Sequence, residues 1–130
     1  MRLSGKNDRD LLKRSRDFAI RIIRMYAGLP KSGEAQVIGK QVLRSGTSVG
    51  AHIAEAEHAK SRAEFQSKIE GALQELEETR YWMELLLDAE IVRASKLQPL
   101  LNESSELIAI LVTIAHRSQK TTRTLAGKEG

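Results

Sequence analysis

A chain of 130 residues has room for one hydrophobic core, which predicts a single domain. It contains no cysteine, and this excludes a disulfide framework, a thiolate metal site and a cysteine nucleophile. The N-terminus lacks the apolar core of a signal peptide, and no apolar run is long enough to span a membrane, so we expect a cytoplasmic protein with no membrane contact.

The net charge of +4 is unevenly distributed along the chain. Residues 1–28 carry eight Lys or Arg against three Asp, whereas residues 62–90 carry three Lys or Arg against eight Asp or Glu. A basic segment of this kind can follow the phosphates of a nucleic acid. The alternative is that basic and acidic helices neighbour one another within the fold.

The first predicted helix spans residues 8–27 and has an apolar face that carries Leu11, Phe18, Ile22 and Met25. Its opposite face is cationic. With two cations of the C-terminal tail, this face supplies the candidate nucleic-acid contacts: Arg9, Lys13, Arg14, Arg16, Arg21, Arg24, Lys120 and Arg123.

The second predicted helix spans residues 33–58 and carries Gly39, Gly46 and Gly50 in its interior. Each glycine costs about 0.8–1 kcal/mol relative to alanine, so the helix needs a compensating contact. The three share one strip, which predicts a groove for the close approach of a second helix, from this chain or from another subunit. A different strip is polar. With two aromatic residues of the third helix it forms a candidate bundle or subunit interface: Gln41, Arg44, Ser48, His52, Glu55, Tyr81 and Trp82.

The third predicted helix spans residues 61–89, and its outward face is acidic. Ser61 and Glu64 form an S-x-x-E capping box at its start. Tyr81 and Trp82 lie beside its apolar seam. They can stack on bases, or they can anchor a helix–helix or subunit contact, which is the more common use of such residues.

The fourth predicted helix spans residues 94–118, and we expect residues 119–130 to fray because the apolar periodicity is lost there. Four amphipathic helices joined by short turns predict an all-α, up-down-up-down four-helix bundle. A three-helix fold and a dimer of helical hairpins also fit the periodicity, but they accommodate four apolar stripes less economically.

The polar strip of the second helix brings a hydroxyl, an imidazole and a carboxylate to one face at Ser48, His52 and Glu55. A mid-helix serine has no oxyanion hole, because the neighbouring amides are used within the helix. Glu55 and His58 form one E-x-x-H, half of the di-iron motif of ferritin-like bundles, and the sequence has no second copy. We therefore expect no catalytic residue, metal or cofactor. A hydrolase or a metalloprotein that uses these residues is the least favoured alternative.

Several short segments then occur in a characteristic order: Phe18-Ala19, Leu29-Pro30, the run from Gln41 to Glu55, Glu64-Phe65 and the run from Glu77 to Trp82. In this order and spacing they resemble the ribosomal-type family of four-helix-bundle proteins, which are encoded by intervening sequences of large-subunit ribosomal RNA genes. The resemblance covers most of the chain. His52 stands where the family usually has asparagine, and Ala56 where many members have glycine.

The resemblance implies a bacterial, cytoplasmic protein that assembles into a ring-like homo-oligomer, with a pentamer as the expected form and no known enzyme activity. It also implies a distant similarity to the accessory proteins of diversity-generating retroelements, which work with a reverse transcriptase and bind nucleic acid. Binding of RNA or DNA by the basic first helix is therefore the leading hypothesis. The alternative is a protein–protein interaction scaffold without nucleic-acid binding, whose protein partner the sequence does not identify.

Overall fold

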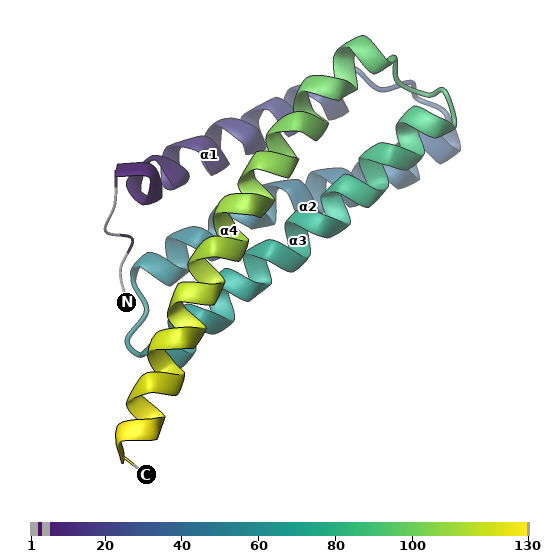
Figure 1. Cartoon of the computed structure of the whole chain (residues 1–130). Helices are drawn as coiled ribbons and strands as arrows, with labels where there is room; N and C mark the ends of the chain where they lie inside the picture. The colour runs from purple at the N-terminus through teal and green to yellow at the C-terminus, as the bar shows by residue number, and fades with distance from the viewer. Residues whose placement is uncertain (1–2, 4–5, 130) are drawn as a thin grey trace.

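The structure is a computed structural model that describes the backbone of residue 3 and residues 6–129, with the side chains of residue 3 and residues 10–120. Its four helices are α1 (Lys6–Ala27), α2 (Gly33–Glu57), α3 (Arg62–Asp88) and α4 (Ala94–Glu129) (Figure 1). No strand occurs in the residues described. The prediction of an all-α four-helix bundle is confirmed.

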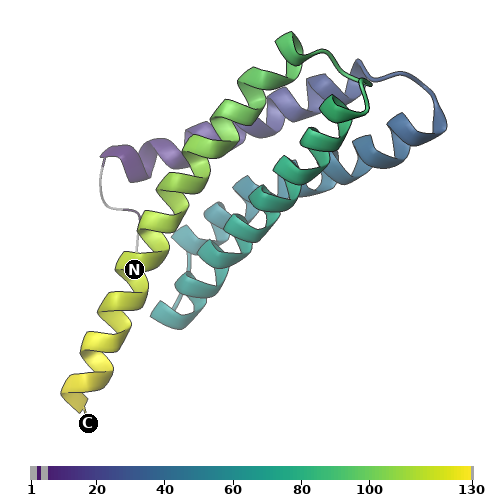
Figure 2. The same cartoon turned by 45° about the vertical axis from the view of Figure 1, so that its right-hand side comes forward.

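The boundaries of α1, α2 and α3 lie within two residues of the predicted ones. Ser61 caps α3, since its hydroxyl accepts a hydrogen bond from the backbone N–H of Glu64 at 3.0 Å. The fourth helix differs from the prediction: α4 continues to Glu129, through the segment expected to fray, and extends beyond the other helices (Figure 2). After Pro99 no proline or glycine interrupts this segment before Gly127, so the backbone has no stop signal where the apolar periodicity fades.

The glycine strip of α2 packs against α1 of the same chain. A Cβ atom on Gly46 would lie 3.0 Å from Cγ1 and Cγ2 of Ile22, and one on Gly50 would lie 3.4 Å from the hydroxyl of Ser15. A Cβ on Gly39 would overlap the side chain of Leu29. The predicted close-packing groove is therefore present, and the neighbour that fills it is α1.

The polar strip of α2 packs along α3. Arg44 binds the carboxylates of Glu75 at 3.2 Å and Glu78 at 2.6 Å, and Glu55 binds Lys68 at 2.5 Å. Residue numbers rise along α2 as they fall along α3, so this pair is antiparallel. The hydrogen bonds from Arg44 and Trp82 lower the pKa of Glu78, which keeps the carboxylate charged. The interface is intramolecular at these positions.

One core joins the four helices. Phe18, Ile53, Leu76 and Leu107, one from each helix, are fully buried members of it. Successive helices pack along their lengths, whereas α1 and α4 make fewer contacts with each other. None of the helical segments described is long and apolar enough to cross a membrane.

We predict that Gly46→Ala destabilises the protein while Gly50→Ala does not. Both substitutions gain about 1 kcal/mol of helix propensity, but a methyl group at 46 meets the branched carbon of Ile22, and overpacking of this kind costs roughly 1–3 kcal/mol. In urea unfolding, the free energy of unfolding of Gly46→Ala should be lower than that of Gly50→Ala by at least about 1 kcal/mol. Equal stabilities would show that the α1–α2 contact is looser than described.

A second prediction concerns His52, whose ring packs on Gly71 of α3. A Cβ atom on Gly71 would lie 3.1 Å from Nδ1 and Cε1 of the ring. Gly71→Ala should therefore stabilise the His52→Asn protein by about 0.5–1 kcal/mol more than it stabilises the parent. A double-mutant cycle measured by urea unfolding checks this. Additive effects would mean that the ring does not require a glycine opposite it.

Candidate nucleic-acid interface

The three groups that suggested catalysis are engaged separately. The hydroxyl of Ser48 donates to the backbone carbonyl of Arg44 at 2.7 Å, and Glu55 pairs with Lys68. Nδ1 of His52 is buried without a hydrogen-bond partner. The structure thus places these residues along one interface without linking them as nucleophile, base and carboxylate. Among the side chains described, no group of three or more His, Asp or Glu could hold a metal ion.

The remaining residues of the polar strip and the aromatic pair also lie along the α2–α3 interface. Gln41 is half-buried, and its backbone carbonyl accepts a hydrogen bond from the Ser45 hydroxyl at 2.8 Å, within α2. Trp82 donates from Nε1 to Glu78 at 3.1 Å, and Tyr81 meets Trp82 edge to face with ring centroids 5.1 Å apart. Tyr81 is 55% exposed, so it borders this interface on its solvent side.

Two cations of α1 are held by carboxylates of the same chain. Arg14 binds Glu103 at 2.5 Å and Glu106 at 2.6 Å, and so links α1 to α4. The hydrogen bonds that Arg14 donates to Glu103 raise the pKa of Arg14, and desolvation partly opposes this rise. Lys13 pairs with Asp17 one turn along α1 at 2.9 Å. A phosphate would have to displace these carboxylates, which makes Lys13 and Arg14 poor contacts for a nucleic acid.

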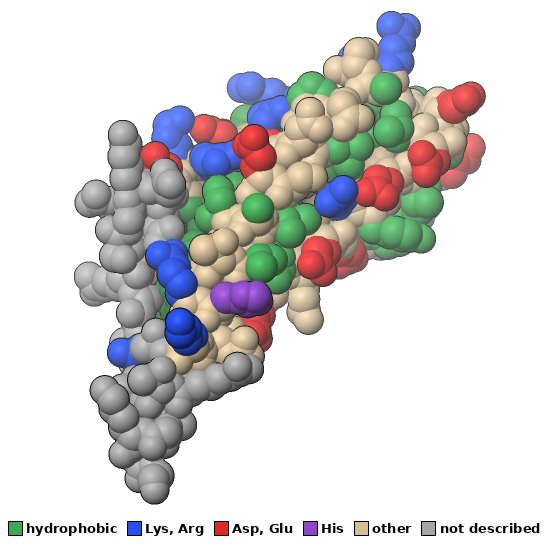
Figure 3. Space-filling model, in the orientation of Figure 1, with side chains coloured by type: hydrophobic (Ala, Val, Ile, Leu, Met, Phe, Trp, Pro, Cys, Tyr) green, Lys and Arg blue, Asp and Glu red, His purple; other side chains and the backbone are tan. Residues whose placement is uncertain are grey.

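The other described cations of α1 are not paired in this way. Arg16 and Arg24 are exposed and Arg21 is half-buried, and no described carboxylate forms an ion pair with any of them. Figure 3 shows basic side chains gathered over α1 and acidic ones over α3. Among the cations of α1 whose side chains are described, these three arginines are therefore the ones available to an external anion.

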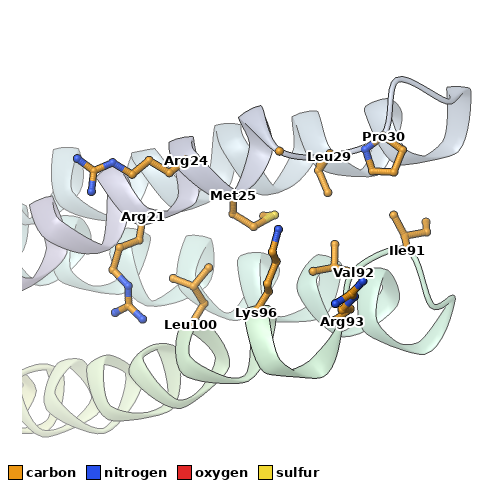
Figure 4. Close-up of a pocket in the computed structure, with 11 residues that line it drawn as sticks. Arg21, Arg24, Met25, Leu29, Pro30, Ile91, Val92, Arg93, Lys96 and Leu100 are labelled. Carbon is orange, nitrogen blue, oxygen red and sulfur yellow. The ribbon is translucent and has the colours of Figure 1, made fainter.

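The fold adds two cations that the sequence analysis did not select. Arg93 and Lys96, at the start of α4, line a cavity of about 580 Å³ together with Arg21 and Arg24 (Figure 4). The signal was present in the sequence, because Lys96 lies in the first turn of a predicted helix, where the macrodipole disfavours a positive charge. The proximity of Lys96 to the arginines of α1 could not be predicted from spacing, since some seventy residues separate them in the sequence.

The last three candidates of the basic face lie elsewhere. Lys120 is exposed on α4, beyond the position of the predicted helix end. Arg9 and Arg123 lie outside the residues whose side chains are described. The candidate interface therefore consists of Arg16, Arg21 and Arg24 on α1 with Arg93 and Lys96 beside them.

Comparison with known proteins agrees with this architecture. A structure from Bacteroides thetaiotaomicron, described as a protein of unknown function from the S23 ribosomal protein family, is 42% identical and superposes with a TM-score of 0.77. The match covers 82% of this chain and 95% of that one. No curated protein sequence matches significantly. The family model for the 23S rRNA-intervening sequence protein matches residues 7–113, and the chain belongs to this family.

Proposed function

We propose that this protein is a non-enzymatic, ring-forming homo-oligomer of up-down-up-down bundles, with a pentamer as the expected form, that binds RNA or DNA through the free cations of α1. The observation that carries the proposal is the contrast along α1. Lys13 and Arg14 are neutralised within the chain, whereas Arg16, Arg21 and Arg24 form no ion pair with any carboxylate whose side chain is described. Its location in the cytoplasm stays a prediction from composition and from the family.

The arrangement suits a polyanion better than a single phosphate. Arg21 and Arg24 lie three residues apart, about 4.5 Å along the helix axis, and Arg93 and Lys96 bring further positive charge from α4 to the same end of the molecule. Counterion release by several such contacts supplies most of the sequence-independent affinity for nucleic acids. In a ring, the same group would recur on each subunit and would form a continuous basic surface.

The polar groups of α2 support a structural role for that helix. Ser48 and Glu55 are each bonded to another group of the chain, and the ring of His52 packs on Gly71. A catalytic side chain must be free to contact its substrate, whereas these side chains contact other groups of the chain. The absence of enzyme activity is a proposal that rests on this engagement and on the family resemblance.

We predict that the double variant Arg21→Gln/Arg24→Gln binds RNA and DNA at least about tenfold more weakly than the parent. The loss of two phosphate contacts should also lower the slope of log K against log salt by roughly 1.4–1.8. Fluorescence polarisation with single- and double-stranded oligomers over a salt series measures both quantities.

The matched control is Lys13→Gln/Arg14→Gln, which removes the same charge from the same helix. Because these side chains already bind carboxylates, this variant should leave the salt slope nearly unchanged. No binding by the parent at low salt, or equal losses in the two double variants, would refute nucleic-acid binding by α1. Partners that co-purify after nuclease treatment would then favour the interaction scaffold.

One observation favours the alternative function, a protein–protein interaction scaffold. Ile20 is 36% exposed and Ile23 is 48% exposed, and both lie on the outer side of α1 between Arg16 and Arg24. Nucleic-acid backbones gain little from aliphatic side chains, whereas a protein partner with apolar and acidic residues would cover both kinds of group.

Self-association has a candidate face on the other side of the bundle. Val37 is 65% exposed and lies one turn before Gln41 on the polar strip of α2, which places it near the end of α3 that carries Tyr81 and Trp82. Exposed aliphatic and aromatic side chains near one another are typical of subunit contacts. We include this face in the proposal as the assembly surface.

The prediction for assembly is that Val37→Glu/Tyr81→Glu lowers the mass in solution towards that of one chain. Both side chains are exposed in the isolated subunit, so the helical content should be retained. Light scattering coupled to gel filtration gives the mass, and circular dichroism the helical content. The matched variant is Ile23→Glu. Loss of the oligomer in Ile23→Glu alone would place the assembly surface on α1 and contradict the assignment to α2 and α3.

A further inference from the structure

A cavity of about 580 Å³ lies between the C-terminal end of α1 and the N-terminal end of α4. Arg21 points from α1 towards α4, and Lys96 points from α4 towards α1, so both reach into the space between the helices (Figure 4). Arg24 and Arg93 complete the charged part of the lining. The rest of the wall is mostly aliphatic and includes Met25, Leu29, Ile91, Val92 and Leu100.

The four cations of this cavity differ from five other described cations of the bundle. Lys13, Arg14, Arg44, Lys68 and Arg80 each have a carboxylate within 4.0 Å. Among the side chains described, no such pair is formed by the four cations of the cavity, and none of the residues that line it is acidic. Positive charges gathered around a partly apolar space repel one another, and an anion placed between them would relieve that repulsion.

The start of α4 increases this unfavourable charge. The first turns of α2 and α3 carry Glu34 and Glu64, which complement the positive end of a helix. The first turn of α4 has no acidic residue and carries Lys96 instead, three residues after Arg93. The N-terminus of α4 therefore adds positive charge to that of the side chains, whereas the C-terminal end of α1 presents the negative end of its helix dipole to the cavity.

Both turns that close the end of the cavity are held in place. In the α1–α2 turn, Gln36 donates to the carbonyl of Pro30 at 2.9 Å and accepts from the Tyr26 hydroxyl at 3.1 Å. In the α3–α4 turn, the N–H groups of Ile91 and Val92 donate to the carbonyl of Leu86 at 2.9 and 3.2 Å. The apolar wall is thus preformed, as is usual in sites for small ligands.

We infer that this cavity binds a small amphiphilic anion, with a carboxylate, sulfonate or phosphate group between Arg21 and Lys96 and an aliphatic or aromatic body against the apolar wall. The volume lies in the range of small-molecule sites. A partner helix has a diameter of about 10 Å and would need a channel open at both ends to lie between α1 and α4. Here residues of both turns line one end, so a compact ligand fits better than a helix.

The inference goes beyond nucleic-acid binding, because it requires the apolar wall as well as the charge. The probe is 8-anilinonaphthalene-1-sulfonate, titrated into the full-length protein and followed by its fluorescence. We expect saturation at one molecule per chain and displacement by decanoate, but not by acetate at the same concentration. Lys96→Gln should weaken binding by about tenfold, whereas Arg16→Gln, which removes an unpaired cation outside the cavity, should leave it unchanged.

Met25→Trp tests the apolar wall, since the larger side chain would occupy the cavity and abolish binding. Val92→Trp does the same from the opposite side and serves if Met25→Trp does not fold. Equal affinities in Lys96→Gln and Arg16→Gln, competition by acetate as strong as by decanoate, or unchanged binding in the tryptophan variants would each overturn the inference. If the protein binds RNA but not the sulfonate, the proposed function stands and the inferred small-anion site is refuted.

Discussion

The close approach of α1 to α2 is the constraint on which the rest of the molecule depends. Gly46 lets Ile22 reach the backbone of α2, and a side chain at that position would separate the two helices. Because α1 occupies the glycine strip and α3 packs along the polar strip, both strips of α2 are engaged within the chain. The unusual residues of α2 are thereby explained by packing. External contacts by α2 are left to its outer residues, such as the exposed Val37.

Two kinds of cation follow from this arrangement. Arg14 and Arg44 each bridge two carboxylates on a neighbouring helix and fix how that helix lies. Exposed pairs of this type contribute about 0–1 kcal/mol each, so their effect is on geometry more than on stability. Arg21 and Lys96 have no such partner among the carboxylates whose positions the structure describes. These two cations also line one cavity together with Arg24 and Arg93.

Periodicity and local chemistry predicted much of this fold, but not the partners of individual residues. The extents of α1, α2 and α3, the cap at Ser61 and the close-packing role of the α2 glycines follow from patterns within about thirty residues. The carboxylates that bind Arg14 lie some ninety residues away, and a helical pattern shows which face is polar without showing what covers it. For the same reason Lys96 could be recognised as unfavourable at a helix start, whereas the cavity that it enters could not be foreseen.

The proposed nucleic acid and the inferred small anion draw on some of the same cations, yet the two modes use different physics. A polyanion gains from releasing counterions along a row of charges, and this gain falls steeply with salt. A compact ligand in the cavity gains from removing aliphatic surface from water, a contribution of about 25 cal/mol per Å² that salt does not screen. Arg16 lies outside the cavity and can serve only the first mode, whereas Met25 and Leu100 can serve only the second. The two activities are therefore separable in one chain, and occupation of the cavity by a small anion would lower the charge that α1 presents to a nucleic acid.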